Sequence, residues 1–131
     1  MGKASRRKGA AYENELAKLF REIGFEDAKR HLEFQSDEAE EGRDLDGTQP
    51  LAVQAKCWKS TPSIEAINQI VPNDEYPIRV AILKRTQSTG RPGLEVAVID
   101  LDILLRIIDT LRNPDEQESE ADMWEYIVNG G

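Results

Sequence analysis

The chain has 131 residues with a formal net charge of -8, and hydrophobic residues make up 39% of it. This length and composition predict one domain with one modest core, and no apolar run is long enough for a transmembrane helix. The basic N-terminal residues lack the apolar stretch of a secretory signal, and the single cysteine, Cys57, excludes an internal disulfide. We therefore expect an intracellular, cytoplasmic protein.

The residue types also restrict the metals that the chain can bind. With one histidine, His31, and one cysteine, a zinc site built from several imidazoles and thiolates cannot form. A metal would be held mainly by oxygen ligands, which favours Mg²⁺ or Mn²⁺. We expect His31 on the surface and Cys57 in the core.

Charge is distributed unevenly along the chain. Four basic residues with no acid between them lie near the N-terminus: Lys3, Arg6, Arg7 and Lys8. The acidic net charge argues against a general nucleic-acid binder, whereas this basic stretch is suited to contact a phosphate backbone. We expect a flexible basic arm at residues 1–9, a single folded domain at 10–112, and an acidic tail with a short helix at 113–131.

Hydrophobic periodicity predicts a helix at residues 10–23, ended by Gly24. After an acidic loop at 33–43, a strand near 43–46, a turn and a strand at 51–58 are expected to form a hairpin. The remaining elements are a helix at 62–70, strands at 78–84 and 94–99, and a helix at 101–112. The buried face of that last helix is predicted to be Ile103, Leu104, Ile107, Ile108 and Leu111. Because hairpins join some of the strands, the sheet must be mixed, which predicts a small α/β domain.

The strand at 51–58 carries the residues that indicate a function. Side chains alternate between the two faces of a strand, so Gln54 and Lys56 share one face while Leu51, Val53, Ala55 and Cys57 face the core. The hairpin places Asp44 level with Gln54. A carboxylate, an amide oxygen and an ammonium group then converge, which suits a hard divalent cation and phosphodiester hydrolysis. Lys56 would orient water or stabilise charge on the phosphate.

These residues, taken in order, resemble the PD-(D/E)XK nuclease superfamily and, within it, the archaeal and phage Holliday-junction resolvases. The series begins with Lys8-Gly9 and an acid four residues later, Glu13, and continues with Gly24-Phe25 and Arg30. It ends with Asp44 before the hairpin and with Gln54-Ala55-Lys56 in place of acid-x-Lys. The resemblance covers residues 6–110 and implies a restriction-endonuclease-like fold, a central mixed sheet flanked by helices in the order α-β-β-β-α-β.

The resemblance also implies a set of site residues. Glu13, Asp44, Gln54 and Lys56 would be catalytic, and a Mg²⁺ or Mn²⁺ ion would bind Asp44, Gln54, Glu13 and the main chain of Ala55. The helical pattern alone does not choose between Glu13 and Glu15. Hairpin geometry favours Asp44, and Asp46 is the alternative ligand. Gln54 replaces the usual glutamate, a variant that also resembles Mrr-type nucleases, and this loss of a charge predicts weaker metal binding.

The function that the resemblance implies is cleavage of branched DNA, with a four-way junction as substrate and a homodimer as the active form, because two strands are cut symmetrically. DNA contacts are expected from Lys3, Arg6, Arg7, Lys8, Arg30 and Lys59. Two alternatives remain open. One is an Mrr-type restriction or repair nuclease with the same chemistry, and the other is a catalytically inactive DNA-binding module.

Overall fold

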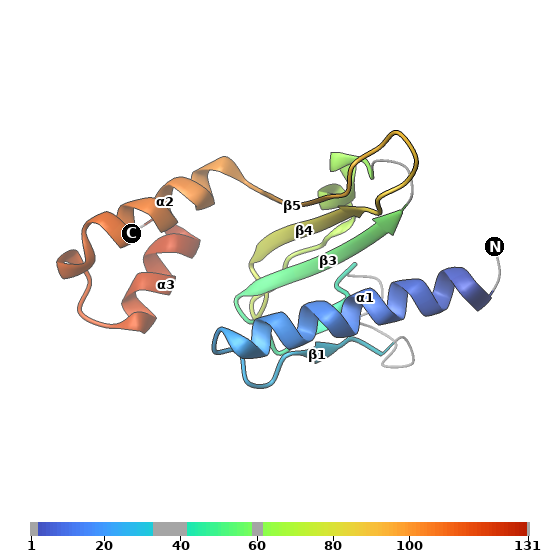
Figure 1. The fold of residues 1–131 in the computed structure, drawn as a ribbon. Coiled ribbons are helices and arrows are strands. Elements are labelled where there is room, and N and C mark those ends of the chain that lie inside the picture. The colour runs from blue at the N-terminus through green and yellow to red at the C-terminus, as the bar shows by residue number, and fades with distance from the viewer. Residues whose placement is uncertain (1–2, 33–41, 59–61, 131) are drawn as a thin grey trace. The chain divides into compact units, whose positions relative to one another are not determined.

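The computed structural model describes residues 3–32, 42–58 and 62–130, and the side chains of the first helix from Gly9 onward (Figure 1). The chain divides into two compact units, Met1–Val98 and Ile99–Gly131. In the described residues, the first unit contains a long helix, five strands and a 3₁₀ helix. In chain order these are α1 (Lys3–Glu22), β1 (Lys29–Arg30), β2 (Leu45–Asp46), β3 (Leu51–Trp58), η2 (Ile64–Gln69), β4 (Ile78–Arg85) and β5 (Leu94–Ile99).

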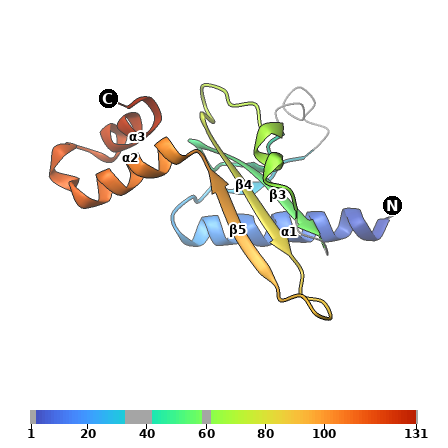
Figure 2. The same ribbon diagram turned by 90° about the horizontal axis from the view of Figure 1, so that it is seen from above.

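The main sheet has the strand order β3-β4-β5. Strands β3 and β4 are parallel and pair without interruption from Leu51 opposite Ile78 to Trp58 opposite Arg85. Strands β4 and β5 run in opposite directions and are joined by a short loop (Figure 2). The sheet is therefore mixed and belongs to an α/β unit, as the hydrophobic pattern predicts.

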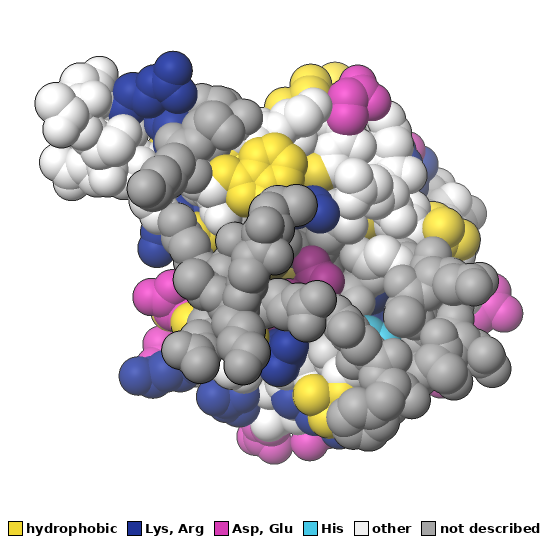
Figure 3. All heavy atoms as spheres, turned by 90° about the vertical axis from the view of Figure 1, so that its right-hand side faces the viewer, with side chains coloured by type: hydrophobic (Ala, Val, Ile, Leu, Met, Phe, Trp, Pro, Cys, Tyr) yellow, Lys and Arg dark blue, Asp and Glu magenta, His cyan; other side chains and the backbone are white. Residues whose placement is uncertain are grey.

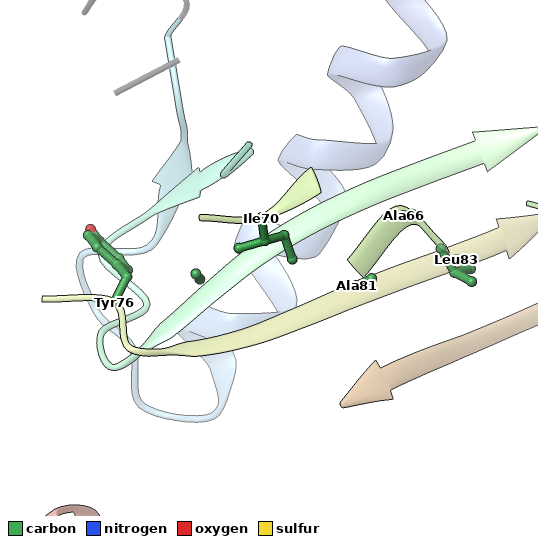
Figure 4. Packing of buried hydrophobic residues seen from close by; sticks show 6 residues of the cluster. Ala66, Ile70, Tyr76, Ala81 and Leu83 are labelled. Atoms are coloured by element: carbon green, nitrogen blue, oxygen red, sulfur yellow. The ribbon is translucent and has the colours of Figure 1, made fainter. Parts of the chain in front are cut away.

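Both faces of β3 are covered. On one face, Val53 packs with α1 in a cluster that includes Tyr12, Leu16, Ala17 and Leu45. On the other face, Ala52 packs with residues from η2, β4 and the segment between them: Ala66, Ile70, Tyr76, Ala81 and Leu83 (Figure 4). The face that carries Gln54 is thus covered by η2, and the polar residues of β3 lie at the border of this second core.

The N-terminal arm and the hairpin differ from the predictions. Helix α1 begins at Lys3, so residues 3–9 are helical and do not form a separate arm, in keeping with the high helix propensity of alanine, lysine and arginine. Strand β2 pairs with β1, with Arg30 opposite Leu45, instead of forming a ladder with β3. Thr48 closes the turn after β2: its hydroxyl donates to the Leu51 carbonyl, and its own carbonyl accepts from the Leu51 N–H.

The second unit contains α2 (Leu101–Arg112), η3 (Pro114–Glu116) and α3 (Glu120–Asn129). Helix α2 therefore belongs with the acidic tail, contrary to the prediction of one domain at 10–112. The predicted buried face is also wrong in part, because Leu104, Ile108 and Leu111 are exposed. Helix α3 is the packing partner of α2 within the unit, and its contacts involve Arg106, which bonds the Ile127 carbonyl, and Asp109, which accepts from Tyr126.

Candidate functional site

Asp44 is held by three hydrogen bonds where the chain enters β2, between β1 and β3. Its main-chain N–H donates to the Val53 carbonyl and its carbonyl accepts from the His31 N–H, each at 2.8 Å. Its carboxylate oxygen Oδ2 accepts from the Ala55 N–H at 2.8 Å. Asp44 therefore lies level with Gln54, between the two residues that flank it in β3.

The environment of Asp44 perturbs its ionisation. Burial raises the pKa of the Asp44 carboxyl above its ordinary value. The hydrogen bond from Ala55 and the electrostatic interactions with Lys56, His31 and Arg30 lower this pKa, but burial prevails. A partly desolvated carboxylate with basic groups around it is a typical feature of functional sites.

Gln54 is almost fully buried, with 4% of its surface exposed. Its side-chain nitrogen Nε2 donates to Oε1 of Gln69, the last residue of η2, at 3.0 Å. Its amide oxygen Oε1 is buried and has no hydrogen-bond partner in the described part of the chain. Buried polar atoms of this kind are uncommon, and an ion, a water molecule or a functional role usually accounts for them.

Lys56 follows two residues later on the same face of β3 and is half-buried. Within the described residues it has no carboxylate partner at ion-pair distance, although its charge lowers the pKa of Asp44. Ala55 lies between Gln54 and Lys56 and contributes its N–H to Asp44. Asp44, Gln54, Ala55 and Lys56 are therefore brought together.

Glu13 and Arg30 form an ion pair in the first unit. The guanidinium Nε of Arg30 donates to the Glu13 carboxylate at 2.8 Å, and both side chains are partly buried. The same guanidinium acts on the charge of Asp44, so the pair lies within electrostatic range of the site. The carboxylate of Glu15, in contrast, lies 3.9 Å from the ammonium group of Lys84. The structure thus separates the two acids that the helical pattern left equivalent.

A buried polar cluster adjoins the Asp44 segment. Asp46 is contacted by Nδ1 of His31 at 3.0 Å and by Nε of Arg43 at 3.2 Å. Arg43 stacks on the ring of Tyr76 at 3.8 Å, and the Tyr76 hydroxyl accepts from the Gly47 N–H. Asp46, the alternative ligand, is therefore engaged by two basic side chains. The prediction that His31 lies on the surface is wrong, since it is 6% exposed and joins this cluster.

The residues predicted to contact DNA are described only in part. The side chains of Lys3, Arg6, Arg7 and Lys8 and all of Lys59 lie outside the described residues. Trp58, at the end of β3, is 47% exposed. Figure 3 shows the side of the molecule near the N-terminus of α1, where hydrophobic atoms lie beside both basic and acidic side chains.

Gln69, Arg43 and Tyr76 are site neighbours that the sequence pattern did not indicate. Gln69 lies 15 residues after Gln54, and Tyr76 lies beyond it in an irregular segment. No local periodicity connects these positions with β3. Only the i, i+3 spacing of Arg43 and Asp46 is a local signal for an ion pair.

The residues around Asp44 supply some, but not all, of the oxygen ligands that a hard cation needs. No group of three or more His, Cys, Asp or Glu side chains in the described residues is arranged to hold a metal ion. However, the buried oxygen of Gln54 and the Asp44 carboxylate are two oxygen donors of the kind that Mg²⁺ and Mn²⁺ prefer. The unpartnered Gln54 oxygen is the observation that supports the fit.

Comparison with known proteins gave no match among family models, curated proteins or solved structures. Among the helices of the described residues, none combines the length and the apolar character needed to cross a membrane.

Proposed function

We propose that this chain is a metal-dependent endonuclease that cleaves branched DNA, most simply a Holliday-junction resolvase that acts as a homodimer. The observation that carries the proposal is the placement of the Asp44 carboxylate against the Ala55 N–H, between Gln54 and Lys56. In this arrangement the Asp44 carboxylate contacts the main chain of β3 at Ala55, between the strand residues that carry an amide oxygen and an ammonium group. The sequence resemblance supplies the expectation that the substrate is a four-way junction.

In this proposal Asp44 and Gln54 hold the cation through their side-chain oxygens, and the main-chain carbonyl of Ala55 completes the expected set. A bound Mg²⁺ ion supplies polarisation of the phosphate and a more acidic water molecule. Lys56 stabilises the charge that develops on the phosphate oxygens, because its ammonium group lies near enough to Asp44 to act on that carboxyl. Glu13 joins as a ligand only if it releases Arg30.

A second candidate function is a DNA-binding module that does not cleave. The observation that favours it is the engagement of Glu13 by Arg30, which leaves Asp44 as the one carboxylate offered at the site by the described residues. Two carboxylates are the more common arrangement for two-metal phosphate chemistry. The same fold could then bind a junction through its basic residues alone.

A cleavage assay on a labelled four-way junction and its linear duplex tests the proposal. It compares Mg²⁺, Mn²⁺ and chelator for the wild type, Asp44→Asn and Lys56→Ala. Lys84→Ala is the matched control, because Lys84 lies on the neighbouring strand and pairs with Glu15. Sedimentation of the wild type with the junction reports whether two copies bind.

We expect paired, metal-dependent nicks in the junction that are lost in Asp44→Asn and Lys56→Ala and retained in Lys84→Ala. Equal cleavage of junction and duplex would replace the resolvase by an Mrr-type nuclease. Tight junction binding without cleavage in either metal would favour the binding module. Cleavage that persists in both site variants would show that the reaction takes place elsewhere.

A further inference from the structure

The side chain of Gln54 has two ends with different surroundings. Its nitrogen is bonded to Gln69, whereas its oxygen is buried without a hydrogen-bond partner in the described residues. Leaving a buried acceptor unpaired costs the free energy of removing that group from water. The arrangement is therefore expected to persist only where another group pairs with this oxygen.

The hydrogen bond to Gln69 leaves the oxygen end of the Gln54 amide over. Because the Gln69 oxygen Oε1 accepts the bond, Gln54 must present its NH₂ group there and its oxygen on the opposite side. The main chain of Gln69 is itself constrained, since its carbonyl lies directly against Gly42, two residues before Asp44. Gln69 thus connects η2 with both segments that build the site.

The same contact explains why glutamine suits position 54. A glutamate there would place a carboxylate oxygen opposite the Gln69 oxygen, so that two acceptors would meet. The Gln69 amide would have to turn and donate its NH₂ group instead. The pair Gln54–Gln69 therefore satisfies the contact without a charge, while one amide oxygen remains for another ligand.

We propose that Gln69 is a positioning residue that orients the Gln54 amide so that its oxygen serves, beside Asp44, as a ligand for a hard divalent cation. This inference rests on the proposed function, because it assigns the cation to the same site. Residues that orient metal ligands through hydrogen bonds typically change metal affinity about 10–100-fold when they are replaced. Gln69 is exposed, so replacing it removes the contact without opening the core.

Calorimetric titration of the full chain with MnCl₂ tests this role in the absence of DNA. The variants are Gln69→Leu and Gln69→Ala, which remove the acceptor, and Gln69→Glu, which retains an acceptor. Asn68→Leu is the matched control, because Asn68 is the neighbour of Gln69 on η2 and bonds Glu65 instead. Circular dichroism verifies that each variant is folded, and Asp44→Asn serves as the reference for a lost ligand.

We expect Gln69→Leu and Gln69→Ala to weaken Mn²⁺ binding about 10-fold or more, and Gln69→Glu and Asn68→Leu to retain at least about one third of the wild-type affinity. Unchanged affinity in Gln69→Leu and Gln69→Ala, with affinity lost in Asp44→Asn, would overturn the inference while leaving the proposed site in place. In that case a buried water molecule would be the partner of the Gln54 oxygen. A wild type that binds no Mn²⁺ would overturn both the inference and the metal-dependent function.

Discussion

Replacing Gly42 by alanine tests whether the contact between the Asp44 segment and η2 determines the geometry of the site. Gly42 has a φ of +73°, and a Cβ atom placed on it would lie 2.1 Å from the main-chain carbonyl oxygen of Gln69. The left-handed conformation costs a residue with a side chain roughly 1–2 kcal/mol. Displacing a packed main chain adds about 1–3 kcal/mol, so we expect a loss of about 2–5 kcal/mol in the free energy of unfolding.

Gly90 provides the matched control for this substitution. Its φ of +79° is nearly the same, but nothing lies within 4 Å of a Cβ atom at that position. Gly90→Ala should therefore lower the free energy of unfolding only by the cost of the left-handed conformation, roughly 1–2 kcal/mol. Urea unfolding of both variants, followed by circular dichroism, measures the difference between them, which is expected to be about 1–3 kcal/mol.

The comparison also has a functional readout. Because the Cβ atom added at position 42 would push on Gln69, Gly42→Ala should weaken Mn²⁺ binding, whereas Gly90→Ala should leave it unchanged. Equal losses of stability in the two variants would refute the reasoning, since they would show that η2 moves away from residue 42 at no cost. A destabilised Gly42→Ala with unchanged Mn²⁺ affinity would keep the packing argument and contradict its connection to the site.

Three further predictions concern the groups around the site. Burial raises the pKa of Asp44, so folding disfavours the ionised carboxylate. The contribution of Asp44 to the free energy of unfolding is therefore largest below the pKa of the unfolded chain, and it is lost as the pH rises through the pKa of the folded protein. Asp44→Asn should therefore be more stable than the wild type near pH 7 without metal, as urea unfolding between pH 3 and pH 8 would measure, and a less stable variant would contradict this. Leu45 follows Asp44 and is 0% exposed, so Leu45→Ala should lower the free energy of unfolding by about 2–5 kcal/mol. A decrease below about 1 kcal/mol in thermal unfolding would mean that this core is loosely packed. Tyr12→Phe removes the bond from the Tyr12 hydroxyl to Glu95 at 2.7 Å, so a loss of about 1 kcal/mol is expected from chemical denaturation, and no loss would show that water replaces the bond.

Local patterns in the sequence predict much of the fold. The alternation of apolar residues places β5 at residues 94–99, and it separates the two faces of β3, where Val53 packs on α1 and Ala52 packs on η2. The helical spacing predicts a buried face of α1 that includes Tyr12, Leu16, Leu19, Phe20 and Ile23; Tyr12 and Leu16 are buried, whereas Leu19 and Ile23 are exposed. The predictions for α1 and β3 succeed because an element with a buried face repeats its apolar residues at the period of its own geometry. Strand β5 shows the same alternation although none of its residues is buried.

The candidate site could be predicted only in part. Asp44, Gln54 and Lys56 are close in sequence to the turn that joins β2 and β3, so local geometry is enough to bring them together. The burial of His31 and its contact with Asp46 could not be read from the sequence. That contact depends on the pairing of β1 with β2, two-residue strands that carry too little pattern to be recognised.

The residue types define the chemical groups of the candidate site: the carboxylates of Asp44 and Asp46, the amide of Gln54 and the ammonium group of Lys56, with oxygen donors in place of several thiolates and imidazoles. The orientation of those groups, in contrast, follows from long-range packing. The parallel pairing of β3 with β4 requires a connection across the sheet, and η2 lies in that connection and covers Gln54. A contact of this kind joins residues far apart in the chain, and its geometry follows from the packing of the whole unit, which no local pattern records.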